Sequence, residues 1–154
     1  MKDVSPTALV DLSMDLARSL HNDDRFERLL DAVRKGIACD AIVLLVCDHD
    51  TLRPLAQQGL HSDVLGRRFL IDHHPRFHAM MEQGTPISFP ADSSLPDPYD
   101  GLVLGHNGEL PIHACLGIPL IRNQRILGVL TLDSLTAGAF EALSRYTLDV
   151  IGTC

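Results

Sequence analysis

The chain has 154 residues, 45% of them hydrophobic and 21% charged, and this composition predicts one globular domain with a buried core. Its formal net charge of −7 comes without a basic stripe, which argues against direct binding of nucleic-acid phosphates by this domain. The longest apolar run, residues 41–47, is too short to cross a bilayer, and the N-terminus lacks a basic and apolar secretory signal, so we expect a cytoplasmic protein.

The N-terminal part of the chain predicts two amphipathic helices. Residues 5–21 open with Ser-Pro-Thr, a helix start signal, and then carry leucines at spacings of three and four. The polar stretch at residues 22–24 ends this helix and caps a second one over residues 25–38. The leucines of the first helix form a seam: Leu9, Leu12, Leu16 and Leu20.

The middle of the chain predicts a hairpin followed by short elements. Residues 41–47 are a β-prone apolar run typical of a central strand, and residues 52–57 return after a turn at residues 48–50. The shorter elements are a loop with a helical turn over 59–66, a strand over 68–71, a helix over 75–83 ended by Gly84, and an edge strand over 87–89.

The C-terminal part predicts the two longest strands and a last helix. The strands cover residues 113–121 and 126–133 and connect tightly around Asn123 and Gln124. The helix is expected from Ala139 to the end, with Leu143, Leu148 and Val150 on its apolar side. We expect it to continue into a longer chain and the terminal helices to pair across a two-fold axis, giving a homo-oligomer. Covering of the same seams within one chain is the alternative.

This order of elements predicts an α+β fold, in which helices pack on an antiparallel β-sheet. Irregular loops on the front face of such a sheet would enclose a pocket.

A stiff loop over residues 89–102 holds two carboxylates three positions apart. Three prolines fix φ and remove backbone donors, and Gly101 adopts conformations closed to other residues. Asp97 and Asp100 are therefore held at a set separation, which suits a hard or borderline cation. An ordinary surface turn rich in Asp and Pro is the alternative.

Cys115 and Asp133 lie on the two long predicted strands. Alternation places His113 and Cys115 on one face of their strand, away from its aliphatic side. A three-residue connection would pair Cys115 with Asp133, whereas a two-residue connection would put them on opposite faces unless a bulge intervenes. Taken singly, Cys115 is typical of a small buried residue and Asp133 of a cap or turn. Together beside the Asp97 loop they indicate a site, and three oxygens with one thiolate are compatible with ferrous iron.

Several segments resemble a known family of sensory domains. The last strand, Ile-Leu-Gly-Val-Leu-Thr-Leu-Asp over residues 126–133, looks like that of a GAF domain. The more specific likeness is to the regulatory domain of the NorR family of bacterial nitric-oxide-responsive activators, from about residue 8 to the end. It is carried by residues 63–69, 74–76, 89–102, 113–115 and 131–133, with Phe-Pro-Ala-Asp-Ser-Ser-Leu-Pro-Asp-Pro-Tyr-Asp-Gly-Leu as the most specific segment.

The resemblance implies a function and a set of residues. It implies a single GAF-type sensor domain over residues 1–154, part of a longer chain whose ATPase domain it holds inactive and which also carries a DNA-binding domain. It implies a mononuclear non-haem Fe²⁺ that takes nitric oxide as signal ligand, with no enzymatic activity. The implied metal ligands are Asp97, Asp100, Cys115 and Asp133, with Arg76, Tyr99 and His113 around them.

Other readings of the sequence point to different sites. His73, His74 and His78 stand close together and suggest a zinc or copper site, although no partner carboxylate accompanies them. No nucleophile elbow, P-loop or dinucleotide fingerprint indicates an enzyme. A GAF domain that binds another small ligand, such as a cyclic nucleotide, is the alternative function. The four cysteines, Cys39, Cys47, Cys115 and Cys154, are expected as free thiols, with Cys39 and Cys47 as core residues.

Overall fold

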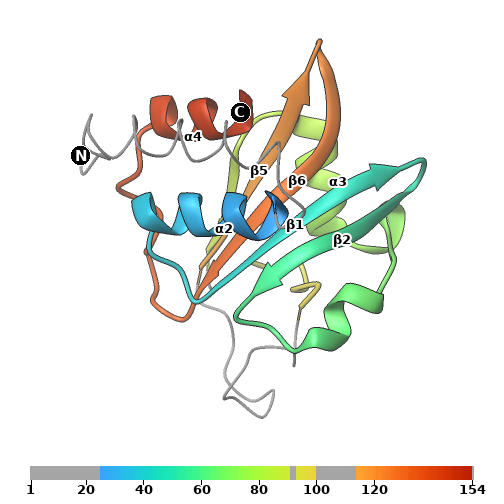
Figure 1. Cartoon of the computed structure of the whole chain (residues 1–154), viewed down its shortest axis with the longest axis horizontal. Helices are drawn as coiled ribbons and strands as arrows, with labels where there is room; N and C mark the ends of the chain where they lie inside the picture. The colour runs from blue at the N-terminus through green and yellow to red at the C-terminus, as the bar shows by residue number, and fades with distance from the viewer. Residues whose placement is uncertain (1–24, 91–92, 100–113, 154) are drawn as a thin grey trace.

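Six antiparallel strands form one sheet in the computed structural model, which describes residues 25–90, 93–99 and 114–153 (Figure 1). The strand order is β3-β2-β1-β6-β5-β4. The strands are β1 (Ala41–Asp48), β2 (Thr51–Gln58), β3 (Phe69–Leu70), β4 (Ile87–Pro90), β5 (Ala114–Arg122) and β6 (Arg125–Ser134). The helices are α2 (Arg25–Gly36), α3 (Pro75–Gln83) and α4 (Arg145–Thr153), with 3-10 turns η1 (Ser62–Gly66) and η2 (Ile71–His73). The predicted α+β class is confirmed.

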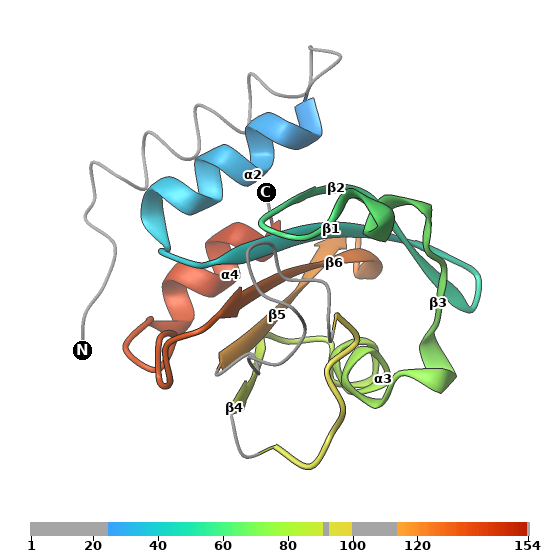
Figure 2. The ribbon, with the colours of Figure 1, turned by 90° about the horizontal axis from the view of Figure 1, so that it is seen from below.

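The helices lie on opposite faces of the sheet. Figure 2 shows α2 and α4 on one side and α3 on the other. Alternate side chains of β1 follow this division, because Ile42 and Leu44 pack in the core with α2 and α4, whereas Val43 and Leu45 pack in the core with α3. We call the two sides of the sheet the α2/α4 face and the α3 face.

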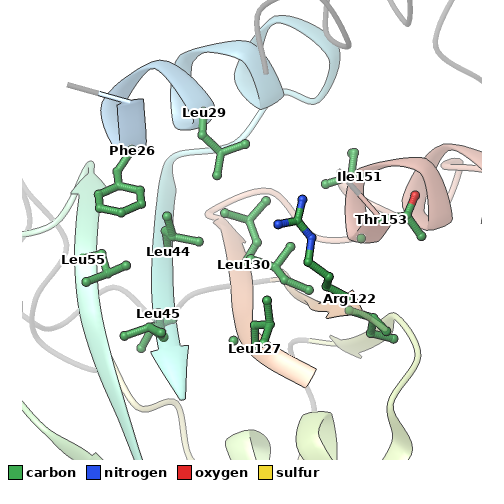
Figure 3. A pocket seen from close by; sticks show the side chains of 15 residues that line it. Phe26, Leu29, Leu44, Leu45, Leu55, Arg122, Leu127, Leu130, Ile151 and Thr153 are labelled. Carbon is green, nitrogen blue, oxygen red and sulfur yellow. The ribbon is translucent and has the colours of Figure 1, made fainter. Parts of the chain in front are cut away.

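The α2/α4 face is apolar. Its buried strand residues are Ile42, Leu44, Ala56, Ala114, Leu116, Ile118, Leu130 and Leu132. Between α2 and α4 the sheet forms the floor of a pocket of about 250 Å³, into which Phe26, Leu29 and Ile151 project (Figure 3). Arg122 is the only charged residue among those that line it within the described structure.

The hairpin of β5 and β6 combines a two-residue turn with a bulge. Asn123 and Gln124 have φ values of 52° and 65°, which a tight type I′ connection requires. The register shifts between Leu120 and Ile121, so that Leu127 has no partner in the ladder and Cys115 pairs with Asp133. Of the arrangements that the sequence left open, the structure has the short turn with a bulge.

Helix α3 has the predicted bounds. Pro75 occupies its first turn, and Gly84 ends it in the left-handed conformation with φ 67°. The helix approaches β5 closely at Gly117, where any Cβ would collide with the side chain of Met80. A glycine at this position of β5 therefore lets α3 lie directly against the sheet.

The last helix begins later than the sequence predicted. It starts at Arg145 rather than at Ala139, because the Ser144 hydroxyl accepts a hydrogen bond from the Thr147 amide at 3.1 Å and caps the helix there. Leu143 precedes the helix, and both Leu143 and Leu148 pack against the core of their own domain. This packing favours the alternative in which the apolar side of the last helix is covered by its own domain rather than by a second chain.

Other differences from the prediction are small. Helix α2 ends at Gly36 rather than at residue 38. Cys39 and Cys47 are partly buried at the borders of the two cores. The predicted helix over residues 5–21, with its leucine seam, lies outside the described residues, as does Cys154. Within the described ranges, no helix is both long enough and apolar enough to span a membrane.

Candidate metal centre

Asp133 is a buried carboxylate near the end of β6. Alternation with Leu132 turns its side chain to the α3 face, and it is 1% exposed. Neither carboxylate oxygen has a hydrogen-bond partner among the residues that the structure describes. A buried charge in this state is unfavourable unless a cation or a proton neutralises it.

The surroundings of Asp133 favour its neutral form when no cation is bound. Burial, and secondarily the charge of Asp97, raise the pKa of this carboxyl from 3.8 to about 8. The thiol of Cys115 and the charge of Arg76 lower the pKa of Asp133, but by less. The thiol lies near the carboxyl without completing a hydrogen bond of normal geometry. At neutral pH the carboxyl therefore holds a proton that a cation would displace.

Cys115 faces Asp133 across the β5–β6 ladder. Its side chain is 1% exposed and packs in the core of the α3 face, whereas its neighbours Ala114 and Leu116 pack on the other face. Burial raises the pKa of the Cys115 thiol well above 9.0, and Asp133 adds to the shift while Arg76 opposes it. Of the registers that the sequence left open, the structure has one that places the thiol and the carboxylate opposite each other on one face.

Tyr99 fixes the loop that carries Asp97. Its amide donates to Asp97 Oδ1 at 2.9 Å, and its hydroxyl lies 2.9 Å from Thr131 Oγ1. The ring is fully buried and meets Phe69 and Phe77 edge-on, with ring centroids 5.9 Å apart in each case. Burial, and then Asp133, raise the pKa of the phenol well above 10.0, so the hydroxyl stays protonated.

Arg76 supplies a buried positive charge beside the pair. It comes from the first turn of α3, is 6% exposed, and donates from Nε to the Leu95 carbonyl at 3.0 Å. Its guanidinium carbon lies 5.2 Å from the centroid of the Phe89 ring. Its charge lowers the pKa of both Cys115 and Asp133. Arg76 therefore favours the ionised forms that would bind a cation.

The structure gathers part of the predicted residue set. Cys115 and Asp133 are neighbours, and Asp97 and Arg76 are near enough to shift the pKa of both. Within the described ranges, however, no three His, Cys, Asp or Glu residues lie close enough together to hold a metal ion. Asp100 and His113 lie outside those ranges. The four-ligand set therefore stays a prediction.

The two buried donors of the set, Asp133 and Cys115, do fit a cation. A carboxylate that has no hydrogen-bond partner in the described part of the chain and a thiol lie on one buried face and provide hard and soft donors, and both need a cation to ionise there. Sequence reasoning missed Thr131, which shares this face with Asp133. The signal was the alternation of the polar residues Thr131 and Asp133 with Leu130 and Leu132 near the end of β6.

His74 and His78, two of the residues suggested for a zinc or copper site, have different neighbours in the structure. His74 stacks edge-on against Phe69, with ring centroids 5.1 Å apart, and burial lowers its pKa below 6.5. His78 Nε2 instead lies 3.9 Å from Asp72 Oδ1 at the surface. No metal-binding group that includes these histidines occurs in the described part of the chain.

Sequence comparison identifies related regulators. A protein named regulatory protein LuxO from Vibrio cholerae is 46% identical over 151 residues, covering 98% of this chain and 28% of that protein. Proteins named anaerobic nitric oxide reductase transcription regulator NorR are 42% identical in Aliivibrio fischeri, covering 92% of this chain and 28% of the relative, and 45% identical in Serratia proteamaculans, covering 96% and 29%. The chain thus spans less than a third of each of these relatives.

Solved structures share the fold. A GAF domain from a phosphoenolpyruvate-protein phosphotransferase of Coxiella burnetii is similar with a TM-score of 0.67 and 25% identity, covering 93% of this chain and 86% of that one. Free methionine-R-sulfoxide reductase from Neisseria meningitidis, an enzyme, has a TM-score of 0.60 at 15% identity, covering 96% and 89%, so it shows the fold alone. The family model of the GAF domain matches residues 21–153, and the chain belongs to this family.

Proposed function

We propose that this domain is the signal-input domain of a bacterial transcription activator, and that it senses nitric oxide through one bound Fe²⁺. Two kinds of observation support the proposal. Relatives named NorR match nearly the whole chain at 42% and 45% identity. The Asp133 carboxylate is buried beside the Cys115 thiol and has no hydrogen-bond partner among the described residues, and this observation carries the proposal.

Asp97, Asp100, Cys115 and Asp133 are the residues that would hold the iron. Fe²⁺ with three carboxylates and one thiolate has a formal charge of about −2, so a buried centre needs a further positive charge. Arg76 is buried beside the pair and meets that need. Bound ferrous iron would supply a coordination position for nitric oxide.

Arg76 acts as a hydrogen-bonding neighbour of the centre rather than as a ligand. A guanidinium has no lone pair to give while it is protonated, and it stays protonated in proteins. Its Nε already donates to Leu95 in the loop that carries Asp97. A change of charge at the centre would therefore alter the contact between α3 and this loop. Movement of α3 would pass the signal to the ATPase domain of the full-length chain.

Anaerobic iron analysis tests the proposal. The protein is purified without oxygen, supplied with ferrous salt, exposed to nitric oxide and examined by electron paramagnetic resonance. We expect one iron per chain and the half-integer-spin signal of nitric oxide on non-haem Fe²⁺. Folded protein without iron or without this signal would overturn the proposal and leave a different small ligand as the signal.

A pair of matched carboxylate variants sharpens this test. Asp133→Asn removes the buried carboxylate, whereas Asp63→Asn removes an exposed one in η1. We expect the first variant to lose iron while the domain stays folded, and the second to keep it. Equal iron content in both variants would exclude Asp133 as a ligand.

A further inference from the structure

We propose that Thr131 is a positioning residue of the cation site, because its hydroxyl fixes Tyr99 and, through Tyr99, the Asp97 carboxylate. The inference rests on the proposed function for the identity of the cation, whereas the contacts themselves are properties of the folded chain.

Thr131 is held rigidly by the sheet. It lies in β6 between two neighbouring strands, pairs with Val43 of β1 and Gly117 of β5, and is fully buried. It stands two positions before Asp133 and therefore projects from the same face. A group that is hydrogen-bonded to this hydroxyl is therefore held at a fixed position relative to the strand that carries Asp133.

Tyr99 connects this fixed point to the loop. Its hydroxyl lies 2.9 Å from Thr131 Oγ1, and its amide donates to Asp97 Oδ1 at 2.9 Å. The ring cannot swing away easily, because Phe69 and Phe77 pack edge-on against it. The position of the hydroxyl therefore sets the position of the Tyr99 backbone, and with it that of the Asp97 side chain.

The contact between the Thr131 and Tyr99 hydroxyls can be tested by substitution. Both oxygens are buried, so replacing threonine by valine, which has nearly the same shape, would leave the phenol without this partner. Serine would retain the hydroxyl and lose only a methyl group. If the hydroxyl is what positions the loop, serine will rescue the site and valine will not.

Hydrogen exchange in the metal-free protein tests the contact. We compare the amide of Tyr99 with the amide of Leu44 in β1 for wild type, Thr131→Val and Thr131→Ser. We expect Thr131→Val to lower the protection of the Tyr99 amide about tenfold relative to Leu44, and Thr131→Ser to restore it. Thr147→Val is the matched control, because it removes another fully buried hydroxyl, in α4 on the other face.

Cobalt binding tests the function of the contact. Co²⁺ is a spectroscopic probe because its thiolate charge-transfer band reports ligation by Cys115. We expect Thr131→Val and Tyr99→Phe each to weaken Co²⁺ binding about tenfold, as losses next to a metal site do. The double variant should be no weaker than either single one, because both remove the same bond.

The outcomes separate this inference from the proposed function. Wild type that binds no Co²⁺ and no Fe²⁺ would overturn the metal site and with it the role of Thr131 there, whereas hydrogen exchange would still decide whether the Thr131 hydroxyl positions the loop. Unchanged Tyr99 protection in Thr131→Val would overturn the inference, as would Co²⁺ affinity that is equal in Thr131→Val and Thr131→Ser. If Thr131→Val does not fold, Tyr99→Phe, which keeps the packed ring, replaces it in both measurements.

Discussion

The two faces of the sheet use the same strands for different purposes. Toward α2 and α4, β6 presents Leu130 and Leu132, and the buried hydroxyls of Ser144 and Thr147 on that side hydrogen-bond to each other. Toward α3 the same strand presents Thr131 and Asp133, and the buried neighbours include Cys115, Tyr99 and Arg76. Aliphatic burial stabilises a fold, whereas a buried unpaired carboxylate costs stability. Both faces therefore contribute an apolar core, but among the described residues the α3 face also buries a carboxylate and a guanidinium, which lower stability.

The cavity on the α2/α4 face does not weaken this contrast. The pocket of about 250 Å³ is lined mainly by aliphatic side chains, with Arg122 as the only charged group among its described lining residues (Figure 3). A ligand site combines a mainly apolar lining with a small number of precisely placed polar groups that fix orientation. The buried polar residues of the α3 face meet that requirement better.

The largest expected effect comes from the apolar face. Leu132→Ala deletes a side chain that is fully buried in the core with α2 and α4, and we expect it to lower the free energy of unfolding by about 2–5 kcal/mol. Urea unfolding followed by circular dichroism measures the loss. The Co²⁺ affinity of the remaining folded protein should be unchanged, and a parallel loss of Co²⁺ affinity would show that the two faces are not independent.

Asp133→Asn should have the opposite effects to Leu132→Ala, with metal binding lost and stability retained. In metal-free wild type the folded carboxyl, with its pKa raised to about 8, holds a proton that the unfolded chain releases near pH 4. Wild-type stability is therefore lost as pH rises between about 4 and 8. From pH 6 to pH 8 the carboxyl should remove about 2 kcal/mol. The asparagine variant should lack this loss, and metal binding should disappear with it.

The difference between wild type and variant isolates this effect. His74, whose pKa is lowered by burial, destabilises the fold as pH falls, but it contributes equally to both proteins. Urea titrations of both proteins at pH 6, 7 and 8 give the difference directly. A constant difference across this range would mean that Asp133 is ionised in the metal-free protein and that burial is not its main influence.

Local patterns predicted much of the fold. Alternation and turn residues defined both hairpins, and Pro75 and Gly84 marked the ends of α3. The start of α4 was missed because the cap at Ser144 is a single hydroxyl within a polar stretch. Such a cap competes with several equally plausible starts in the sequence.

The site was less accessible to sequence reasoning because its properties depend on tertiary contacts. The pairing of Cys115 with Asp133 depends on the bulge at Leu127, beside a point where Gly128 lies so close to the Leu45 carbonyl that no Cβ fits. The raised pKa of Asp133 depends on burial by the elements around it. Arg76 entered the predicted set through family resemblance alone, since nothing local marks an arginine in a first helical turn as buried.

Arg76→Gln should have a moderate effect. The variant loses the charge beside Asp133 and keeps a shorter polar side chain, so we expect one iron per chain and a metal affinity within about tenfold, or 1.4 kcal/mol, of wild type. In the full-length activator that we propose, repression without nitric oxide should be lost or the response strongly altered. Arg68→Gln, at an exposed position, is the matched control. Normal repression and induction in Arg76→Gln would remove Arg76 from signalling.

The smallest expected effect concerns the turn that sets the register of the two faces. A one-residue slip of β6 against β5 would exchange Leu132 and Asp133 between the faces, so the turn and the bulge together keep the carboxylate on the α3 face. Gln124 has φ 65°, which strains a residue with a Cβ, and Asn-Gly is the favoured pair for such a turn. Gln124→Gly should therefore stabilise the domain by about 0.5–1 kcal/mol.

Thermal unfolding together with Co²⁺ titration measures this last effect. The turn is exposed and lies at the far end of the hairpin from the Cys115–Asp133 pair, so the variant should melt higher with unchanged Co²⁺ affinity. Asn123→Gly, at the neighbouring position with φ 52°, should stabilise less, because asparagine tolerates the left-handed region better than glutamine does. A gain in stability accompanied by weaker Co²⁺ binding would mean that the strained turn, and not the bulge, holds Asp133 against Cys115.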